Sequence, residues 1–310
     1  MNASTGTWPS VGVVVPTHDR PELLRETLRA ILAQDVPAPL DVVVVFDKST
    51  PDPSLEAMSS AGRRVRVVAN TRTPGLAGAR NSGIVSLETD WVAFCDDDDT
   101  WAPGKLAAQL ARVRSAPDAV MVTTAIRVAY EGTEVDRLAG QDRILHADLL
   151  RSRMAMLHSS SVLLRRSALM GELGLVDEDI PGSQNEDWDL LLRAASLAPI
   201  EHVDEPLVRV PWGRTSFFSR KWETLADSLE WMLARHPGIA SDPVGAARVY
   251  GQLAFTSAAL GRRGVAVRWA ARAARRRWRE PRVLIALAVA GRLVSADRVL
   301  AVLNSRGRGL

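Results

Sequence analysis

Cysteine is almost absent from this sequence, whose 310 residues include only Cys95. A single cysteine excludes an intramolecular disulfide, and it leaves no cysteine cluster of the kind that holds structural zinc. The N-terminal residues also lack a basic segment followed by an apolar core, so they do not predict a secretory signal peptide. Both absences favour a cytoplasmic protein.

Long hydrophobic runs are missing as well. The longest apolar run near the C-terminus, VLIALAVAG, has nine residues and stops at Arg292. A helix that spans a bilayer needs roughly 20 such residues. No transmembrane helix is therefore predicted.

Glycine-rich nucleotide loops are absent from the predicted strand ends. No G-x-G-x-x-G motif follows any of them, which argues against a dinucleotide-dependent oxidoreductase. The loop after the first predicted strand reads PTHDRPELL, whereas sugar nucleotidyltransferases usually have a Gly-rich loop with Arg or Lys at that place. A sugar nucleotidyltransferase is therefore disfavoured, and it is kept as an alternative.

The rest of the composition is that of an ordinary globular chain, with 46% hydrophobic and 24% charged residues. Its net charge of +3 is unevenly distributed, because residues 261–310 contain 13 arginines against Glu280 and Asp297. This segment carries +11, so the other 260 residues carry −8. Such a distribution indicates that the basic end meets an anionic surface while the acidic body does chemistry.

The hydrophobic pattern predicts an α/β fold followed by helices. Up to about residue 99, short β-branched runs alternate with amphipathic helical stretches, which is typical of a parallel sheet. The strands are nearly continuous in apolar residues, so we expect helices on both faces of the sheet. The part from about 119 to 210 is predicted to be mixed, and from about 219 onward only helices are expected, the last over 281–303. The predicted strands cover 11–15, 41–46, 64–69 and 91–95.

Four aspartates, Asp96 to Asp99, follow the last of these strands without a break. Two like charges 4 Å apart repel by about 4 kcal/mol at an effective dielectric of 20, so the cluster calls for a cation. The carboxyl edge of a parallel sheet is where ligands bind in open α/β folds. Carboxylate oxygens suit Mg²⁺ or Mn²⁺. A divalent cation site is predicted there, and a solvated acidic turn that caps the next helix is the alternative.

Several motifs occur in a fixed order over about residues 11–216. They are VVVPTHDRPELLRETLRAIL, DVVVVFDKSTPD, GLAGARNSGI, WVAFCDDDDTWAPGKL, SSVLLRRSALMGELGLVDE and NEDWDLLLRA. Together they resemble the family 2 glycosyltransferases, which are inverting enzymes with the GT-A fold, a Rossmann-like mixed sheet flanked by helices. The resemblance implies a GT-A domain over 1–217 and an all-helical, Arg-rich region over 218–310. It also implies transfer of a sugar from a nucleotide-diphosphate donor to an acceptor hydroxyl, in polysaccharide, glycolipid or natural-product glycoside synthesis.

The resemblance assigns the donor contacts to residues of the strand-end loops. The family's first strand ends in a Pro-Thr/Ser-x-x-Arg turn that touches the nucleotide, an acid after the second strand contacts the base, and an Arg-Asn pair borders the phosphates. In place of the usual Asp-Asp-Gly-Ser, this chain has Phe-Asp-Lys-Ser, which leaves the choice of base open. The implied donor-binding residues are Pro16, Thr17, His18, Arg20, Asp47, Arg80, Asn81, Asp96 and Asp97.

The family's Asp-x-Asp motif falls on Asp96 and Asp98, which are the implied metal ligands. The family's catalytic base falls on Asp187, in a second acidic cluster that opens a predicted helix. Acids in a first helical turn can also simply complement the helix dipole, and this applies to Glu186 and Asp189. The resemblance therefore implies a cation that neutralises the leaving diphosphate and, across the sugar, an aspartate that takes the acceptor proton.

Four further residues are candidates for acceptor or diphosphate contacts. Asp177 lies in a segment similar to the family's Gly-Gly-Phe-Asp-Glu, and Glu186 precedes the implied base. Trp212 and Arg214 occupy the place where the family often has an Arg-, His- and Ser-containing loop that closes on the diphosphate. Trp212 could stack on a sugar and Arg214 could bind phosphate. Surface residues of a loop are the alternative for both.

The Arg-rich C-terminal segment allows three interpretations: the solvated face of a helical hairpin, peripheral contact with a membrane, or an interface between copies of the chain. A nucleic-acid partner is not expected. The expected partners are a nucleotide sugar and a saccharide, lipid-linked or small-molecule acceptor, and a non-catalytic adaptor built on the same scaffold is the rival from another class. One apolar helix face is predicted to consist of Val267, Ala270, Ala271, Ala274 and Trp278, opposite an arginine stripe.

Overall fold

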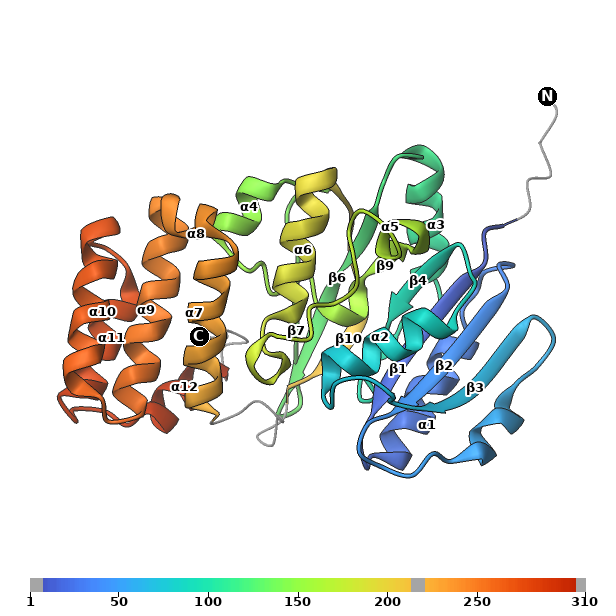
Figure 1. The fold of residues 1–310 in the computed structure, drawn as a ribbon, viewed down its shortest axis with the longest axis horizontal. Helices are drawn as coiled ribbons and strands as arrows, with labels where there is room; N and C mark the ends of the chain where they lie inside the picture. Colours follow the sequence, from blue (N-terminus) through green and yellow to red (C-terminus); the bar gives the residue numbers. More distant parts are fainter. Residues whose placement is uncertain (1–7, 213–220, 305–310) are drawn as a thin grey trace.

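The computed structural model describes residues 8–212 and 221–304, which form one ten-stranded mixed sheet, helices on its two faces and a stack of helices at one end (Figure 1). The strand order is β3-β2-β1-β4-β9-β6-β10-β5, with β7 beside β6 and β8 beside β10. The strands are β1 (Val11–Thr17), β2 (Leu40–Phe46), β3 (Arg63–Ala69), β4 (Trp91–Phe94), β5 (Thr100–Trp101), β6 (Met121–Tyr130), β7 (Thr133–Arg137), β8 (Arg143–Ile144), β9 (Leu163–Arg165) and β10 (Ile200–Pro211).

The first four strands run parallel, as the sequence predicted. β1 pairs with β2 on one side and with β4 on the other, and β2 pairs with β3. β9 is antiparallel to both β4 and β6, which makes the sheet mixed. Because parallel strands point the same way, the loops that follow β1, β2 and β4 meet at one edge of the sheet.

The helices cover both faces of the sheet and then continue as a separate stack at its end (Figure 1). They are α1 (Pro21–Leu32), α2 (Leu76–Ser86), α3 (Lys105–Ser115), α4 (His146–Arg151), α5 (Arg166–Leu169), α6 (Glu186–Leu197), α7 (Trp222–Arg235), α8 (Pro237–Ser241), α9 (Pro243–Ala259), α10 (Arg263–Arg276), α11 (Pro281–Ala290) and α12 (Ala296–Asn304). Three short 3₁₀ turns are η1 (Pro53–Met58), η2 (Ser159–Ser161) and η3 (Pro181–Ser183).

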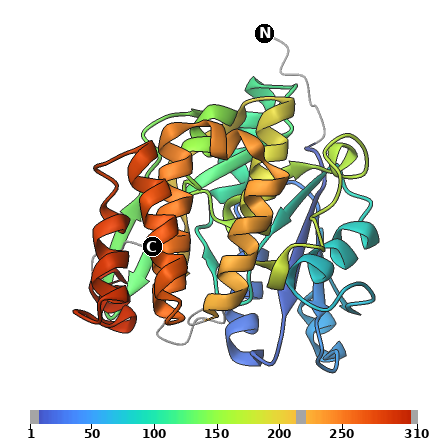
Figure 2. The same ribbon diagram turned by 60° about the vertical axis from the view of Figure 1, so that its left-hand side comes forward.

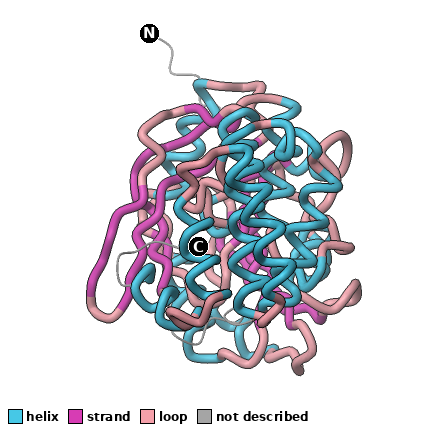
Figure 3. Tube along the Cα trace, turned by 90° about the vertical axis from the view of Figure 1, so that its left-hand side faces the viewer, coloured by secondary structure: helices cyan, strands magenta, loops and turns pink. Residues whose placement is uncertain are grey.

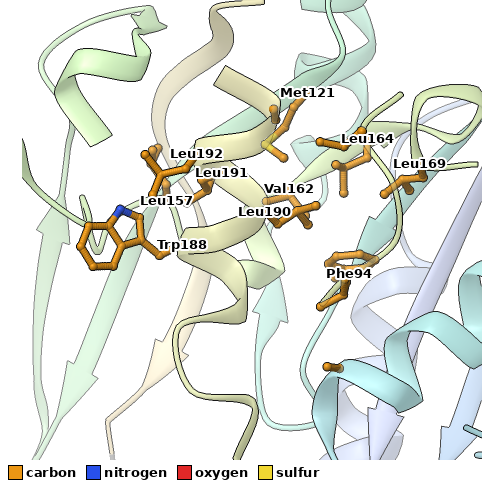
Figure 4. Close-up of a cluster of buried hydrophobic side chains, with 14 of the residues drawn as sticks. Phe94, Met121, Leu157, Val162, Leu164, Leu169, Trp188, Leu190, Leu191 and Leu192 are labelled. Atoms are coloured by element: carbon orange, nitrogen blue, oxygen red, sulfur yellow. The ribbon is translucent and has the colours of Figure 1, made fainter. Parts of the chain in front are cut away.

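Alternate valines of the central strands enter two hydrophobic cores, one on each face. In β1, Val14 packs into the core under α2 and α6, whereas Val13 and Val15 pack into the core under α1 and α3. Burial of a valine-sized side chain contributes roughly 1.5–3 kcal/mol, so the repeated valines hold both helical layers on the sheet. The first of these cores includes Phe94, Met121, Trp188, Leu190 and Leu191 (Figure 4).

Helix α2 lies directly on β1 because Gly83 has no side chain. A Cβ atom built at Gly83 would lie 2.4 Å from Val14 Cγ1, a distance that carbon atoms cannot adopt without a shift of the helix. This close approach fixes the N-terminal half of α2, which includes Arg80 and Asn81, against the strand ends.

The C-terminal helices form a stack beside the sheet (Figure 2). Leu229 and Met232 of α7 and Val249 and Leu253 of α9 belong to the same hydrophobic core as α6, whereas the second half of α9 packs with α10 and α11 around a smaller core. The division of the chain at residues 217 and 218 stays a prediction. Within the described residues, none of the helices combines the length and the apolar character that a membrane crossing requires.

Two predictions for this region are wrong in detail. The helix expected over 281–303 is interrupted between α11 and α12, where Arg292 adopts a left-handed backbone conformation with φ of 61°. The buried face of α10 consists of Ala266, Ala270 and Ala273, while Val267 is exposed and Trp278 lies beyond the end of the helix. Small residues at this spacing let α10 pack closely on α9, and the predicted face was therefore displaced.

Lys105 is a fully buried cation at the start of α3. Its Nζ donates to Gln109 Oε1 at 2.9 Å and lies 3.8 Å from the centre of the Trp101 ring. Burial lowers the pKa of Lys105 to about 7, because the desolvation of its ammonium group has a larger effect than the interaction with Cys95, which raises the pKa. Gln109 and Trp101 in turn donate to the carbonyl oxygens of Ser161 and Ser160, so this group supports η2.

We expect Lys105→Met to increase stability most at acidic and neutral pH. The folded-state pKa lies below the ordinary value, so the unfolded chain binds this proton more tightly, and wild-type stability rises from about pH 7 toward about pH 10. The variant has no such rise. Urea denaturation of both proteins across this range measures the difference, with Lys48→Met at an exposed lysine as the control. A stability difference that does not change with pH would contradict the prediction.

Candidate active site

Charged and polar side chains gather where β1, β2 and β4 end, as the position of the four aspartates predicted. α2, η2 and the first turn of α6 border the same place. Within residues 8–212 and 221–304, six carboxylates gather there together with three guanidinium groups, those of Arg20, Arg80 and Arg153. The carboxylates are those of Asp96, Asp97, Asp98, Asp99, Glu186 and Asp187.

Arg80 joins the two acidic clusters that lie about 90 residues apart in the sequence. Its Nη2 donates to Asp96 Oδ1 at 2.8 Å after β4, and its Nη1 donates to Glu186 Oε1 at the start of α6. The side chain is buried, and its guanidinium also lies 5.3 Å from the centre of the Phe94 ring. Despite desolvation, the pKa of Arg80 is raised by these carboxylates, so the group stays charged.

Asp96 is held by hydroxyl groups of η2 in addition to Arg80. Ser159 Oγ donates to Asp96 Oδ2 at 3.0 Å, and the Asp96 amide donates to Ser160 Oγ at 2.9 Å. Burial opposes the charge, yet Arg80 and His158 outweigh it and the pKa of Asp96 is lowered. Asp96 is therefore an ionised carboxylate with a fixed orientation.

Asp97 and Asp98 contact the turn that follows β1. Thr17 Oγ1 donates to Asp97 Oδ2 at 2.7 Å, and Arg20 Nη1 lies 3.2 Å from Asp97 Oδ1 and 2.6 Å from Asp98 Oδ2. Burial raises the pKa of both carboxyl groups, and neighbouring carboxylates add to the effect. Pro16, which precedes Thr17, is buried in β1. It lies beyond the last β1 residue that pairs with β4, so the N–H group that proline lacks is not needed for a hydrogen bond to β4.

Asp99 and His158 face each other without a hydrogen bond. Asp99 Oδ2 lies 3.3 Å from His158 Nδ1, which accepts from the Ser160 amide at 3.3 Å, and Oδ2 is buried without a hydrogen-bond partner. Burial and Asp96 raise the pKa of Asp99 well above its ordinary value. A proton on Asp99 would allow a hydrogen bond between Asp99 Oδ2 and His158 Nδ1. A bound cation would also stabilise the two facing atoms, because Asp96, Asp99 and His158 have the spacing of metal ligands.

Asp47 lies beside the turn that follows β1. His18 Nδ1 lies 2.7 Å from the Asp47 carbonyl oxygen, and Asn70 Nδ2 donates to Asp47 Oδ1 at 2.8 Å. Asn81 is directed differently: its Nδ2 donates to Glu178 Oε1 at 2.7 Å and to the Val176 carbonyl oxygen at 2.8 Å. Asn81 therefore anchors the segment around Glu178 to α2.

Asp187 is the carboxylate of the second cluster that pairs with Arg153. Its Oδ2 accepts from Arg153 Nη2 at 2.6 Å, and its Oδ1 accepts from the Trp188 amide at 2.8 Å. Burial alone would raise the pKa of Asp187, but Arg153 outweighs it and the pKa is lowered. In contrast, burial raises the pKa of Glu186. The two adjacent acids therefore differ in charge preference, and Asp187 is the one that stays ionised.

The remaining candidates for acceptor or diphosphate contacts were Asp177, Trp212 and Arg214, and the two that the structure describes contact other parts of the chain. Asp177 Oδ1 accepts from the Asp179 amide at 3.0 Å in a local turn, and Trp212 lies 6.0 Å from the Arg137 guanidinium beside β7. Arg214 lies outside the described residues. Asp189, whose helix-dipole role was the alternative, is buried and accepts from His236 Nε2 at 2.7 Å and Arg193 Nε at 2.8 Å, so it joins α6 to the C-terminal helices.

Three contributors to the site were not predicted from the sequence. Arg153 lies in an irregular segment without a motif, so no signal pointed to it. The serines of η2 overlap the start of the motif SSVLLRRSALMGELGLVDE, but the motif assigned no role to them. Asn70 follows the third parallel strand directly, and its position at a strand end was a signal that could have been used.

The sequence of this chain matches the model of glycosyl transferase family 2 over residues 12–171, just over half of its length. The amylovoran biosynthesis glycosyltransferase AmsB of Erwinia amylovora is 25% identical over 254 residues, which cover 78% of this chain and 82% of AmsB. The O-antigen biosynthesis protein RfbC of Myxococcus xanthus is 29% identical over 217 residues, but these cover 68% of this chain and only 16% of RfbC.

Solved structures with the same fold include two nucleotide complexes. Residues 1–349 of S. aureus TarS in complex with UDP give a TM-score of 0.58 at 17% identity, covering 92% of this chain and 91% of that one. The mannosyltransferase PcManGT of Pyrobaculum calidifontis in complex with GDP-Man and Mn²⁺ gives 0.56 at 21% identity, covering 96% and 80%. The expected GT-A fold is confirmed, and the chain belongs to glycosyl transferase family 2 and is a glycosyltransferase.

Proposed function

We propose that this chain is a metal-dependent, inverting glycosyltransferase that uses a nucleotide-diphosphate sugar. The acceptor is a saccharide, a lipid-linked intermediate or a small molecule, in polysaccharide, glycolipid or natural-product glycoside synthesis. The observation that supports this most directly is the Arg80 bridge, which places the β4 aspartates next to the acids of α6. Family membership favours an enzyme over the adaptor alternative, and the low cysteine content favours the cytoplasm as its compartment.

We place the cation at Asp96 and Asp98, on the exposed side of the cluster. The Asp98 side chain is 31% exposed, whereas that of Asp99 is 1% exposed, and a cation that also binds substrate phosphates has to be reachable from solvent. The excess of carboxylates over guanidinium groups supports a positive ligand there. In this arrangement Asp99 is protonated and donates to His158 Nδ1. When bound, the cation would neutralise charge on the diphosphate.

Arg20 and the strand-end residues would bind the donor. Arg20 is only partly buried and contacts Asp98, so its guanidinium can move to a diphosphate when that carboxylate binds the cation. Thr17, His18 and Asp47 lie together after β1 and β2, where the ribose and base would lie. Asp47 is the acid nearest to the base in this arrangement, and UDP, dTDP and GDP are all candidates.

Asp187 would act as the general base. The acceptor hydroxyl gives its proton to the Asp187 carboxylate while its oxygen forms a bond to the anomeric carbon, and the bond from that carbon to the phosphate oxygen breaks with both electrons leaving on the diphosphate. Attack opposite the leaving group inverts the anomeric centre. Arg153 keeps Asp187 ionised and holds the carboxylate in place.

The metal assignment predicts a difference between two adjacent asparagine variants. We expect one nucleotide of a UDP, dTDP and GDP panel to raise the melting temperature only with Mn²⁺, since a ligand at about 100 times its Kd stabilises the folded state by about 2.7 kcal/mol. Asp98→Asn should abolish this shift. Asp99→Asn should retain it, because its amide can still donate to His158 Nδ1. Loss of the shift in Asp99→Asn alone, or no shift with any nucleotide, contradicts the assignment.

The base assignment predicts that Asp187→Asn lowers kcat by about 10²–10⁴. Nucleotide affinity, measured by calorimetry with Mn²⁺, should stay within about twofold, because the variant is isosteric and lies outside the proposed donor contacts. Asp179→Asn at an exposed position is the matched control. Turnover of Asp187→Asn at the wild-type rate, or a product with the donor's anomeric configuration by NMR, would remove Asp187 from this role.

A further inference from the structure

The C-terminal part of the described structure exposes several large apolar side chains on and beside α11. The three most exposed large hydrophobic residues described are Leu293 at 84%, Trp278 at 75% and Leu284 at 74%, and all three belong to the segment around α11. Leu287, one turn after Leu284, is also exposed. We call Trp278, Leu284, Leu287 and Leu293 the α11 face.

The α11 face is directed away from the rest of the protein. Val283, Ala286 and Val289 of α11 are buried against the small core with α9 and α10, so the residues between them in the helical repeat point outward. Leu284 and Leu287 are three residues apart and lie on the same side. Trp278 and Leu293 lie just before and just after the helix. Figure 3 views this end of the protein, where the helices stand in front of the sheet.

Arginines surround these apolar residues. Arg277 and Arg279 precede α11 and Arg292 follows it, and all three are exposed. The Arg279 guanidinium lies 4.4 Å from the centre of the Trp278 ring, an arrangement that leaves both groups at the surface. Of the two acids in the described part of this segment, Glu280 is buried and bound to Arg282. Exposed arginines therefore adjoin the exposed apolar residues at both ends of α11.

We propose that the α11 face binds the surface of an anionic lipid bilayer. Leucine and tryptophan side chains would enter the boundary between headgroups and acyl chains, and the arginines would contact lipid phosphates. A soluble hairpin has no need of three largely exposed apolar residues on and beside one helix. α10 cannot supply this apolar surface, because its small-residue face is buried against α9. The proposal does not depend on the transferase reaction.

Flotation of the full chain with lipid vesicles tests the proposal. We expect binding to phosphatidylglycerol-containing vesicles, no binding to pure phosphatidylcholine, and weaker binding at high salt, since salt screens the arginines. The double variant Leu284→Gln/Leu287→Gln should reduce the partition coefficient at least tenfold. Leu138→Gln/Leu145→Gln, at two leucines elsewhere that are 50% exposed, is the matched control and should leave it unchanged.

The arginines are tested separately. Replacing Arg277 and Arg279 by Gln should weaken binding by roughly fivefold for each charge, the factor that corresponds to about 1 kcal/mol, while Arg29→Gln/Arg64→Gln at exposed arginines elsewhere should not. Circular dichroism checks that each variant is folded. Leu293→Ser is a further variant of the α11 face that lies between helices, so it removes an apolar side chain without changing a helix. The proposal would be overturned if the protein did not float with vesicles, or if the α11-face variants bound as well as the control variants. It would also be overturned if the wild-type protein were a dimer that the α11-face variants dissociate, because a second copy of the chain would then cover this face.

Discussion

A buried arginine that binds two carboxylates from distant parts of the chain is the interaction on which this site depends. Arg80 contacts Asp96 after β4 and Glu186 at the start of α6. Removal of one member of a buried ionic group typically costs about 3–5 kcal/mol, because the partners left behind are unpaired. Gly83 lets α2 lie on β1 and thereby sets the position of the guanidinium. The spacing between the aspartates after β4 and the acids of α6 thus follows from the packing of one helix.

Charge imbalance explains much of the remaining chemistry. Burial raises the pKa of Asp97, Asp98, Asp99 and Glu186, whereas at Asp96 and Asp187 the neighbouring cations and hydrogen bonds outweigh burial and lower the pKa. Asp96 and Asp187 are therefore ionised, one in each of the two acidic clusters. Arg80 and the serines of η2 hold Asp96 in place, and Arg153 holds Asp187. Trp101 and Gln109 in turn support η2.

The sequence was sufficient for the features that repeat or that follow a strand. Apolar runs predicted the parallel strands and their burial on both faces, and the strand ends predicted where Thr17, Asp47 and Asp96 meet. Contacts formed between distant irregular segments could not be predicted, and Arg153 beside Asp187 is the main example. The α10 face was wrong because helical periodicity identifies an apolar side without saying which small residues allow a close helix contact. The break between α11 and α12 depends on one left-handed residue, Arg292, whose type gave no signal.

The central claim is that the aspartates after β4 and the acids of α6 form one site through Arg80. A double-mutant cycle of Asp96→Asn and Glu186→Gln, measured as the free energy of unfolding in urea, tests it without substrate. Residues that share a partner show coupling of about 0.5–3 kcal/mol, whereas independent sites add within about 0.5 kcal/mol. We predict coupling above about 0.5 kcal/mol that disappears when Arg80 is replaced by Met. Additive effects in the presence of Arg80 would contradict the account.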